Sequence, residues 1–161
     1  ERIHQLAPHA RVFNHYGPTE ATVGVLVQRL QADAPAQGFA QVLALKGTAA
    51  LWSQKVLRAG MGAHFGLHLV ESASAADIAQ LNVPLLATSS HQGAFLHQAD
   101  LPWPCAWAMG HEGQGVGPEV ASQAQLWVRI AQPGGEESLN VAAAAAICLH
   151  ASALQACKQV G

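Results

Sequence analysis

Two glycine-rich turns, each placed directly after an apolar strand, decide how this sequence folds. Residues 105–117 read CAWAMGHEGQGVG, and residues 126–140 read LWVRIAQPGGEESLN. In each stretch the leading residues predict a short buried strand, and the glycines that follow predict a turn at its carboxyl end. Ligands of open parallel sheets bind at the carboxyl ends of the strands. We therefore expect both turns to border a ligand site.

Outward from these turns, predicted strands alternate with predicted helices. The strands are apolar throughout rather than at every second residue, which is typical of parallel strands buried on both faces. Ser53 and Ser74 are expected to cap helices, and Asp77, three residues after Ser74, is the acidic first-turn residue of a capping box. Predicted strands cover residues 39–45, 66–70, 84–88, 105–109 and 126–130, and predicted helices cover residues 55–62, 74–81, 118–122 and 139–157. The pattern predicts an α/β fold, a parallel sheet with helices on both faces.

The composition agrees with one globular domain. The chain has 161 residues, of which 50% are hydrophobic and 11% are charged, and its formal net charge is -2. These apolar residues are enough to bury a core, which argues against disorder. Because the net charge is weakly negative, a nucleic-acid partner would need a local patch of basic residues.

Cysteine usage and hydropathy argue against several other classes of protein. Cys105, Cys148 and Cys157 are odd in number and form no CxxC pair, so we expect reduced thiols and a cytoplasmic protein. Histidine and cysteine lack the spacing of metal ligands, and no metal site is predicted. The sequence shows no signal peptide and no apolar run near the ~20 residues that span a bilayer, so no membrane association is expected.

Polar residues at the two turns have two interpretations. Ser138 and Asn140 precede the last predicted helix and suit its N-cap, and Glu112 suits an ordinary turn. The other interpretation places these side chains in a binding pocket. The first turn fits neither G-x-G-x-x-G nor a P-loop, and no G-x-S-x-G elbow occurs, so dinucleotide, P-loop and hydrolase chemistry are not indicated. Position along the chain does not decide between capping and binding.

Three ordered motifs resemble the SpoU/TrmH family of knotted SPOUT RNA methyltransferases. The family's apolar strand followed by G-x-E-x-x-G is mirrored by AWAMGHEGQGV at residues 106–116. Its I-P-M-x-G-x-x-E-S-L-N-V is mirrored by IAQPGGEESLNV at residues 130–141, and its S-P-K-x-x-R-A-x-x-G-A by SQKVLRAGMGA at residues 53–63. The resemblance covers about residues 38–158, and the shared order and spacing make it specific.

The resemblance implies an RNA 2′-O-ribose methyltransferase with a C-terminal deep trefoil knot and S-adenosyl-L-methionine bound in the knot. It also implies a homodimer that pairs through the C-terminal helix and acts on RNA, either rRNA or tRNA. By position, the implied cofactor-binding residues are Gly110, Gly113, Ile130, Leu139 and Thr88. The implied catalytic residues, which orient RNA or cofactor groups, are Glu112, Ser138 and Asn140.

The sequence departs from the family before Phe39. The first motif of the family, N-x-G-x-x-x-R, does not occur there, and Arg29 stands in an unrelated context. We therefore expect an N-terminally truncated domain without the family's proposed catalytic arginine. Residues 11–25, RVFNHYGPTEATVGV, instead resemble the N-x-Y-G-P-T-E motif of adenylation domains in nonribosomal peptide synthetases. The expected division is an adenylation-domain-like fragment at residues 1–30, a linker at 31–37 and a methyltransferase domain at 38–161.

The sequence therefore favours an RNA methyltransferase domain, either active or inactivated by loss of the first motif. Three alternatives remain open. They are a non-catalytic dimer that binds S-adenosylmethionine or RNA, a fragment of an adenylate-forming enzyme that uses ATP and magnesium, and a dimerisation module built on the alanine-rich last helix. Methyl transfer to RNA distinguishes the favoured function from the three alternatives.

Overall fold

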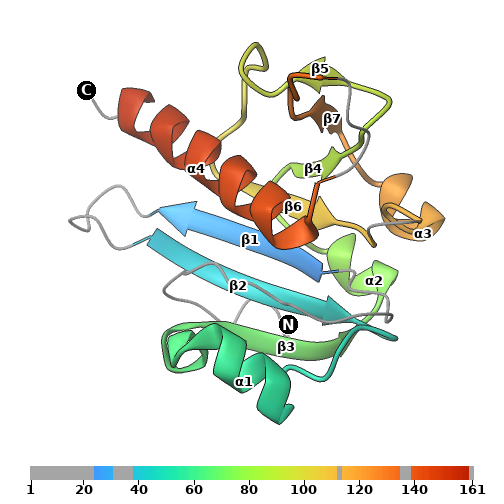
Figure 1. Cartoon of the computed structure of the whole chain (residues 1–161), viewed down its shortest axis with the longest axis vertical. Coiled ribbons are helices and arrows are strands. Elements are labelled where there is room, and N and C mark those ends of the chain that lie inside the picture. Colours follow the sequence, from blue (N-terminus) through green and yellow to red (C-terminus); the bar gives the residue numbers. More distant parts are fainter. Residues whose placement is uncertain (1–23, 31–37, 112–113, 135–138, 160–161) are drawn as a thin grey trace.

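Seven strands form one sheet in the computed structural model, which describes residues 24–30, 38–111, 114–134 and 139–159. The strand order is β3-β2-β1-β6-β4-β7-β5 (Figure 1). The strands are β1 Gly24–Leu30, β2 Gly38–Leu45, β3 His68–Ala73, β4 Leu85–Thr88, β5 Ala94–Phe95, β6 Cys105–Met109 and β7 Leu126–Arg129. The helices are α1 Gln54–Gly60, the 3-10 helix η1 Ala63–Gly66, α2 Ala75–Ile78, α3 Pro118–Ala121 and α4 Val141–Gln159. The predicted α/β class is confirmed.

Six of the seven strands run in one direction. β2 pairs in parallel with β3, and β6, β4, β7 and β5 form a second parallel block. β1 lies between these two blocks and is antiparallel to both of its neighbours, β2 and β6. The prediction of a parallel sheet is therefore correct for six strands and wrong for β1. The direction of a strand depends on the strands it docks against, which its own residues do not encode.

β1 also bears on the expected domain division. Its residues fall in the range 1–30 that the sequence suggested as a separate fragment, yet β1 pairs with β2 along its whole length and with β6 from Gly24 to Gln28. The fragment thus contributes a strand to the sheet of the region 38–161. The linker 31–37 and the adenylation-like residues before Gly24 lie outside the described residues, and the division itself stays a prediction.

Helices cover both faces of the sheet, as the apolar strands predicted (Figure 1). Along β6 the side chains alternate between the faces, with small alanines on one face and larger residues on the other. On the first face, Ala106 and Ala108 pack with Ile78 of α2 and Val120 of α3. On the second face, under α4, Trp107 is completely buried. All of β6 is buried, so this strand lies at the centre of the core.

Most predicted boundaries agree with the structure, and two do not. The predicted strand 66–70 is shifted, because residues Ala63–Gly66 form η1 and β3 begins only at His68. The predicted helix 74–81 ends at Ile78, although its capping box between Ser74 and Asp77 is formed as expected. The short strand β5 had no sequence signal, since its pairing with β7 supplies the ordering.

α4 is the longest helix among the described residues, and it packs on β6 through small side chains. Ala142, Ala145, Cys148, Ser152 and Ala156 are buried on its inner face. By length and mean hydropathy alone, the segment Val141–Lys158 is apolar enough to cross a membrane. The core helix of a globular protein passes the same test, and 33% of this segment is buried inside the fold.

A buried polar group joins α4 to β6. The Trp107 indole Nε1 donates a 2.9 Å hydrogen bond to Ser152 Oγ, and Cys105 Sγ lies 3.6 Å from the same oxygen. Burial raises the pKa of Cys148 to about 12, and the neighbouring Cys105 adds to that rise. Burial also raises the pKa of Cys105, while its contact with Ser152 acts in the opposite direction. Both thiols are therefore protonated and inert near neutral pH, as reduced core cysteines are.

Replacing Ser152 by Ala tests this contact. The change leaves the buried Trp107 Nε1 without its acceptor, so we expect the free energy of unfolding to fall by about 1–3 kcal/mol in urea denaturation. The matched control is Ser122→Ala, whose hydroxyl donates to Glu119 O at the protein surface. The control should change stability by less than about 0.5 kcal/mol. Equal losses in the two variants would contradict the assignment.

Candidate functional site

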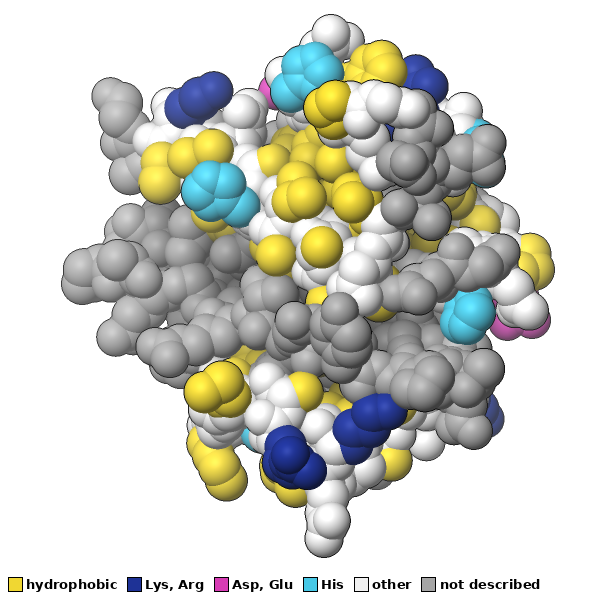
Figure 2. Space-filling view, viewed as in Figure 1, with side chains coloured by type: hydrophobic (Ala, Val, Ile, Leu, Met, Phe, Trp, Pro, Cys, Tyr) yellow, Lys and Arg dark blue, Asp and Glu magenta, His cyan; other side chains and the backbone are white. Residues whose placement is uncertain are grey.

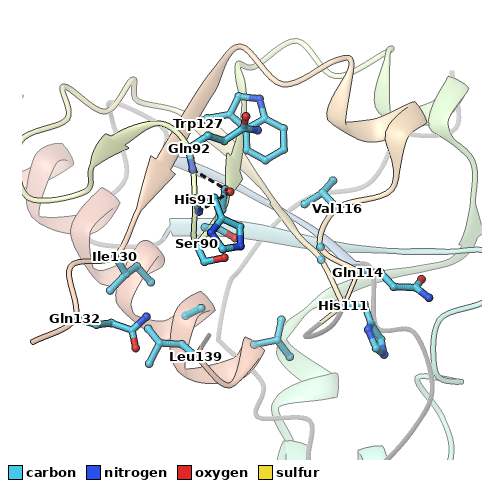
Figure 3. Close-up of a pocket in the computed structure, with 16 residues that line it drawn as sticks. Ser90, His91, Gln92, His111, Gln114, Val116, Trp127, Ile130, Gln132 and Leu139 are labelled. Carbon is cyan, nitrogen blue, oxygen red and sulfur yellow. Dashed lines mark hydrogen bonds between the residues drawn. The ribbon is translucent and has the colours of Figure 1, made fainter. Parts of the chain in front are cut away.

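A pocket of about 580 Å³ lies at the carboxyl ends of β4, β6 and β7 (Figure 3). It is lined by Thr88, Ser89, Ser90, His91, Gln92, Gly110, His111, Gln114, Gly115, Val116, Trp127, Ile130, Gln132, Leu139, Val141 and Ala144. The volume falls within the range of about 300–1,000 Å³ that is usual for sites binding small molecules and cofactors. Because three parallel strands end here, loops that are far apart in the sequence meet at one place.

The turn after β6 forms one wall of the pocket. His111 N donates to Gly115 O at 2.9 Å and Gly115 N donates to His111 O at 2.8 Å, which closes the turn on itself. Gly110 lies so close to the Gly115 backbone that a Cβ atom at Gly110 would overlap its carbonyl group. The absence of a side chain at Gly110 thus permits the tight turn.

The loop after β4 forms the second wall. Ser89 N donates to Val128 O, and Ser89 Oγ accepts hydrogen bonds from His91 N at 3.1 Å and Gln92 N at 3.2 Å. Gly93 has a φ of +96°, and a Cβ there would overlap the Trp127 carbonyl. These contacts hold the loop against β7 and present its polar side chains to the cavity.

Arg129 anchors the far end of this loop. Its Nε donates a 2.9 Å hydrogen bond to Gly93 O, and its guanidinium lies 4.3 Å from the centre of the Phe95 ring. A cation over an aromatic face is electrostatically favourable. The side chain thereby fixes β5 and the loop to β7, and it does not line the pocket.

The third wall comes from the turn after β7 and the start of α4. Figure 3 shows Ile130, Gln132 and Leu139 together on one side of the pocket, opposite His111 and Gln114. Ile130 and Leu139 supply an apolar surface, and glutamine side chains from all three walls supply neutral donors and acceptors. The turn itself includes residues 135–138, which are outside the described residues.

The lining determines what chemistry the pocket can support. No described lining residue is Asp, Glu, Lys or Arg, and the described lining includes two imidazole side chains, His91 and His111. Among the described residues, no three His, Cys, Asp or Glu side chains gather as a metal ion would require. The pocket therefore suits binding through shape, apolar contact, neutral side chains and backbone groups, followed by chemistry that depends on alignment.

Four of the predicted cofactor-binding residues, Thr88, Gly110, Ile130 and Leu139, line this one pocket. Asn140 does not line it, and its Oδ1 accepts from Ala142 N at 3.1 Å and Ala143 N at 3.3 Å, so it caps α4. A catalytic role for Asn140 therefore stays a prediction. The remaining predicted residues, Gly113, Glu112 and Ser138, lie outside the described residues.

The sequence analysis missed the contribution of residues 89–92. A signal was present, because the polar run SSHQ directly follows an apolar strand that ends at Thr88. By the same rule that applies to the two glycine turns, the carboxyl end of that strand is expected to border a ligand site. Gln114 and Gln132 were also missed as lining residues, since nothing in the sequence fixes the direction of a side chain on a turn.

Comparison with known proteins gives these features a context. Residues 33–150 match the model of the SpoU rRNA Methylase family. The chain is 37% identical over 79 residues to the 23S rRNA (guanosine-2′-O-)-methyltransferase RlmB of Bordetella pertussis, a match covering 49% of this chain and 32% of that protein. It is 31% identical over 120 residues to the 23S rRNA (guanosine(2553)-2′-O)-methyltransferase RlmP of Bacillus subtilis, covering 73% of this chain and 48% of that protein.

Solved structures give the same picture. A crystal structure of an RNA 2′-O ribose methyltransferase superposes with a TM-score of 0.63 and 35% identity, covering 71% of this chain and 45% of that one. The AdoMet-bound rRNA methyltransferase of Sinorhizobium meliloti superposes with a TM-score of 0.62 and 27% identity, covering 68% and 44%. The chain thus spans less than half the length of each of these relatives.

The close approach at Gly110 can be tested by Gly110→Ala. The added Cβ would force the turn after β6 to open, and strain of this kind typically costs about 1–3 kcal/mol of unfolding free energy. Gly66→Ala is the matched control, because a Cβ at Gly66 meets nothing within 4 Å. Denaturant titration should show a clear loss for the first variant and little change for the second. A stable Gly110→Ala protein would refute the steric argument.

Proposed function

The chain belongs to the SpoU rRNA Methylase family, and on that premise we propose that it carries the methyl-donor site of an RNA 2′-O-ribose methyltransferase. The observation that carries the proposal is the pocket itself. The two glycine turns, which lie within the matched residues 33–150, both contribute walls to it. The relatives named for this activity act on 23S rRNA, so rRNA or tRNA is the proposed substrate class.

S-adenosyl-L-methionine is the proposed cofactor, and the residues present fit it. An apolar surface at Ile130 and Leu139 suits the adenine ring. The neutral glutamine and serine side chains suit the hydroxyl and amino groups of the cofactor. Gly115 lines the pocket and a Cβ there would meet nothing within 4 Å, so its bare backbone would let the cofactor approach main-chain groups closely. When bound, the cofactor supplies an activated methyl group on a sulfonium centre.

The protein's own task is then alignment and proton removal. The ribose 2′-hydroxyl must be held in line with the methyl group, and its proton must pass to an acceptor. His91 and His111 are the described lining residues with an imidazole, the side chain that most often serves as a general base. Glu112, Ser138 and Asn140 remain proposed as residues that orient RNA or cofactor groups.

The proposal includes the trefoil knot that the resemblance implies. It is supported by the way the chain returns to one place, because the turn after β6, the turn after β7 and the start of α4 all border the same pocket. Segments 105–117 and 126–144 are thereby brought together around a single ligand. A knotted path would hold these segments against each other without a disulfide or a metal ion.

We further propose a homodimer that forms through the outer face of α4. Ile147 is 41% exposed and Leu154 is 52% exposed, and their seven-residue spacing places them two turns apart on one face. Figure 2 shows hydrophobic side chains gathered along α4. A contiguous apolar patch of this kind on an exposed helix typically marks a protein–protein interface.

The donor site is tested by calorimetric binding of S-adenosylmethionine. We expect the wild-type chain to bind it and Leu139→Arg to bind at least about tenfold more weakly, because the guanidinium would enter the apolar side of the pocket. Met61→Arg is the control, since Met61 is 92% exposed and does not line the pocket. A folded wild-type protein that binds no S-adenosylmethionine would contradict the proposed donor site.

Transfer of a labelled methyl group to bulk RNA separates an enzyme from a protein that only binds the donor. Binding without transfer would support the non-catalytic alternative. ATP-dependent pyrophosphate exchange by the chain would instead favour the adenylate-forming alternative, whose motif residues lie outside the described residues.

Light scattering after size exclusion tests the dimer. The double substitution Ile147→Glu and Leu154→Glu places two charges on the outer face of α4, and we expect it to give monomers at concentrations where the wild type is dimeric. The control is Ala76→Glu, an exposed position on α2. A wild-type monomer, or a dimer that survives the double substitution, speaks against this interface.

A further inference from the structure

The large hydrophobic side chains that the described residues expose fall into two groups. Ile147 and Leu154 lie on α4, the proposed dimer face. The other three are Trp52, Met61 and Phe65, which are 53%, 92% and 87% exposed. These three come from one short stretch, the turn before α1, the end of α1 and η1. Exposed apolar side chains that gather in one patch, unlike those scattered singly, mark interaction sites.

Basic residues accompany this second group. Residues 46–70 contain Lys46, Lys55 and Arg58 and no Asp or Glu, in a chain whose formal net charge is -2. Lys55 and Arg58 are exposed on α1, and Figure 2 shows Lys and Arg side chains beside hydrophobic ones over this helix. The stretch is therefore locally basic. A patch of this kind is what a weakly negative chain needs in order to bind a nucleic acid. We call Trp52, Lys55, Arg58, Met61 and Phe65 the α1–η1 surface.

The α1–η1 surface is fixed in place by contacts beneath it. The Trp52 ring lies 5.4 Å from the buried His64 ring, at an angle of 51°. His64 Nε2 is 2.8 Å from Leu51 O, and Leu51 N donates to Glu71 Oε1 of β3 at 2.8 Å. Glu71 is the nearest acid in the sequence, and this hydrogen bond engages one of its oxygens on the backbone. The Trp52 end of the surface therefore needs little ordering when a ligand arrives.

The combination of chemistries identifies the ligand. Exposed aromatic rings offer faces on which unpaired bases stack, and neighbouring cations pair with the phosphates between those bases. A double helix would leave the rings unused, because its bases are stacked within the helix. A second copy of the chain would not explain the basic residues, because like charges would meet across a symmetric interface.

We propose that the α1–η1 surface binds a single-stranded segment of the RNA substrate, with bases stacked on Trp52 and Phe65 and phosphates held by Lys55 and Arg58. This inference rests on the proposed function, because it assumes an RNA substrate. α1 lies beside the β3 edge of the sheet, whereas the pocket lies at β6, β4 and β7 (Figure 1). With strands about 4.8 Å apart, β3 and β6 are separated by about 14 Å. A folded RNA spans such a distance easily. One part of the substrate can therefore bind the α1–η1 surface while another part is methylated at the pocket.

Fluorescence anisotropy with a labelled single-stranded RNA of about 12 nucleotides and mixed sequence tests the inference on the full chain. We expect Phe65→Ala to weaken binding at least about fivefold, because one stacking platform is lost. The double variant Lys55→Gln, Arg58→Gln should weaken binding and flatten its dependence on salt concentration, because fewer counterions are released. The matched control is Lys158→Gln, which removes an exposed cation in the last turn of α4 and should bind RNA as the wild type does.

The outcomes separate this inference from the proposed function, because S-adenosylmethionine binding is measured on the same samples. RNA binding that is unchanged by Phe65→Ala and by the double charge variant overturns the inference, as does a wild type that binds no RNA. In both cases, binding of S-adenosylmethionine tests the pocket independently of RNA binding. Equal affinity for duplex RNA also overturns the inference. A change of oligomeric state in Phe65→Ala with unaltered RNA affinity would assign the surface to contacts between copies. Loss of both ligands by Phe65→Ala would indicate damage to the fold, and the charge variant would then decide.

Discussion

The parallel pairing of β6, β4 and β7 is the constraint on which the rest of the structure depends. Parallel neighbours end at the same edge of a sheet, so the three loops that follow these strands must meet. β6 lies at the centre of the core, with Ala106 and Ala108 under α2 and α3 and Trp107 under α4. The hydrophobic burial that stabilises this strand therefore also fixes where the loop after it emerges. The pocket follows from the packing of the sheet rather than from interactions of its own loops alone.

β1 has an unusual part in this arrangement. It joins the parallel pair β2–β3 to the parallel block β6–β4–β7–β5, and it runs against both. Its residues, Gly24–Leu30, precede residues 33–150, the region that matches the family model. The strand that completes the sheet therefore comes from a part of the sequence without family motifs. An antiparallel strand can fill this position because its two neighbours, β2 and β6, run in the same direction, so β1 forms an antiparallel ladder with each.

The proposed roles divide among three surfaces that the fold keeps apart. The pocket lies at the carboxyl ends of the central strands, the apolar outer face belongs to α4, whose inner face packs on the sheet, and the α1–η1 surface lies at the β3 edge. α4 serves two of these surfaces, because its first residues line the pocket and its exposed residues form the apolar face. Pairing of two chains through α4 would thus directly constrain a wall of the donor site, which links assembly to cofactor binding physically.

The sequence by itself determined the elements whose causes are local. The apolar strand at residues 105–109, the helix cap at Ser53 and the capping box at Ser74 follow from neighbouring residues, and each is present as predicted. The motifs likewise placed Gly110, Ile130 and Leu139 at one site. Tertiary structure alone decided the direction and position of β1 and the entry of Gln114 and Gln132 into the pocket lining. These features depend on contacts between segments that are distant along the chain. Local propensity depends only on neighbouring residues, so it does not determine which distant segments come into contact.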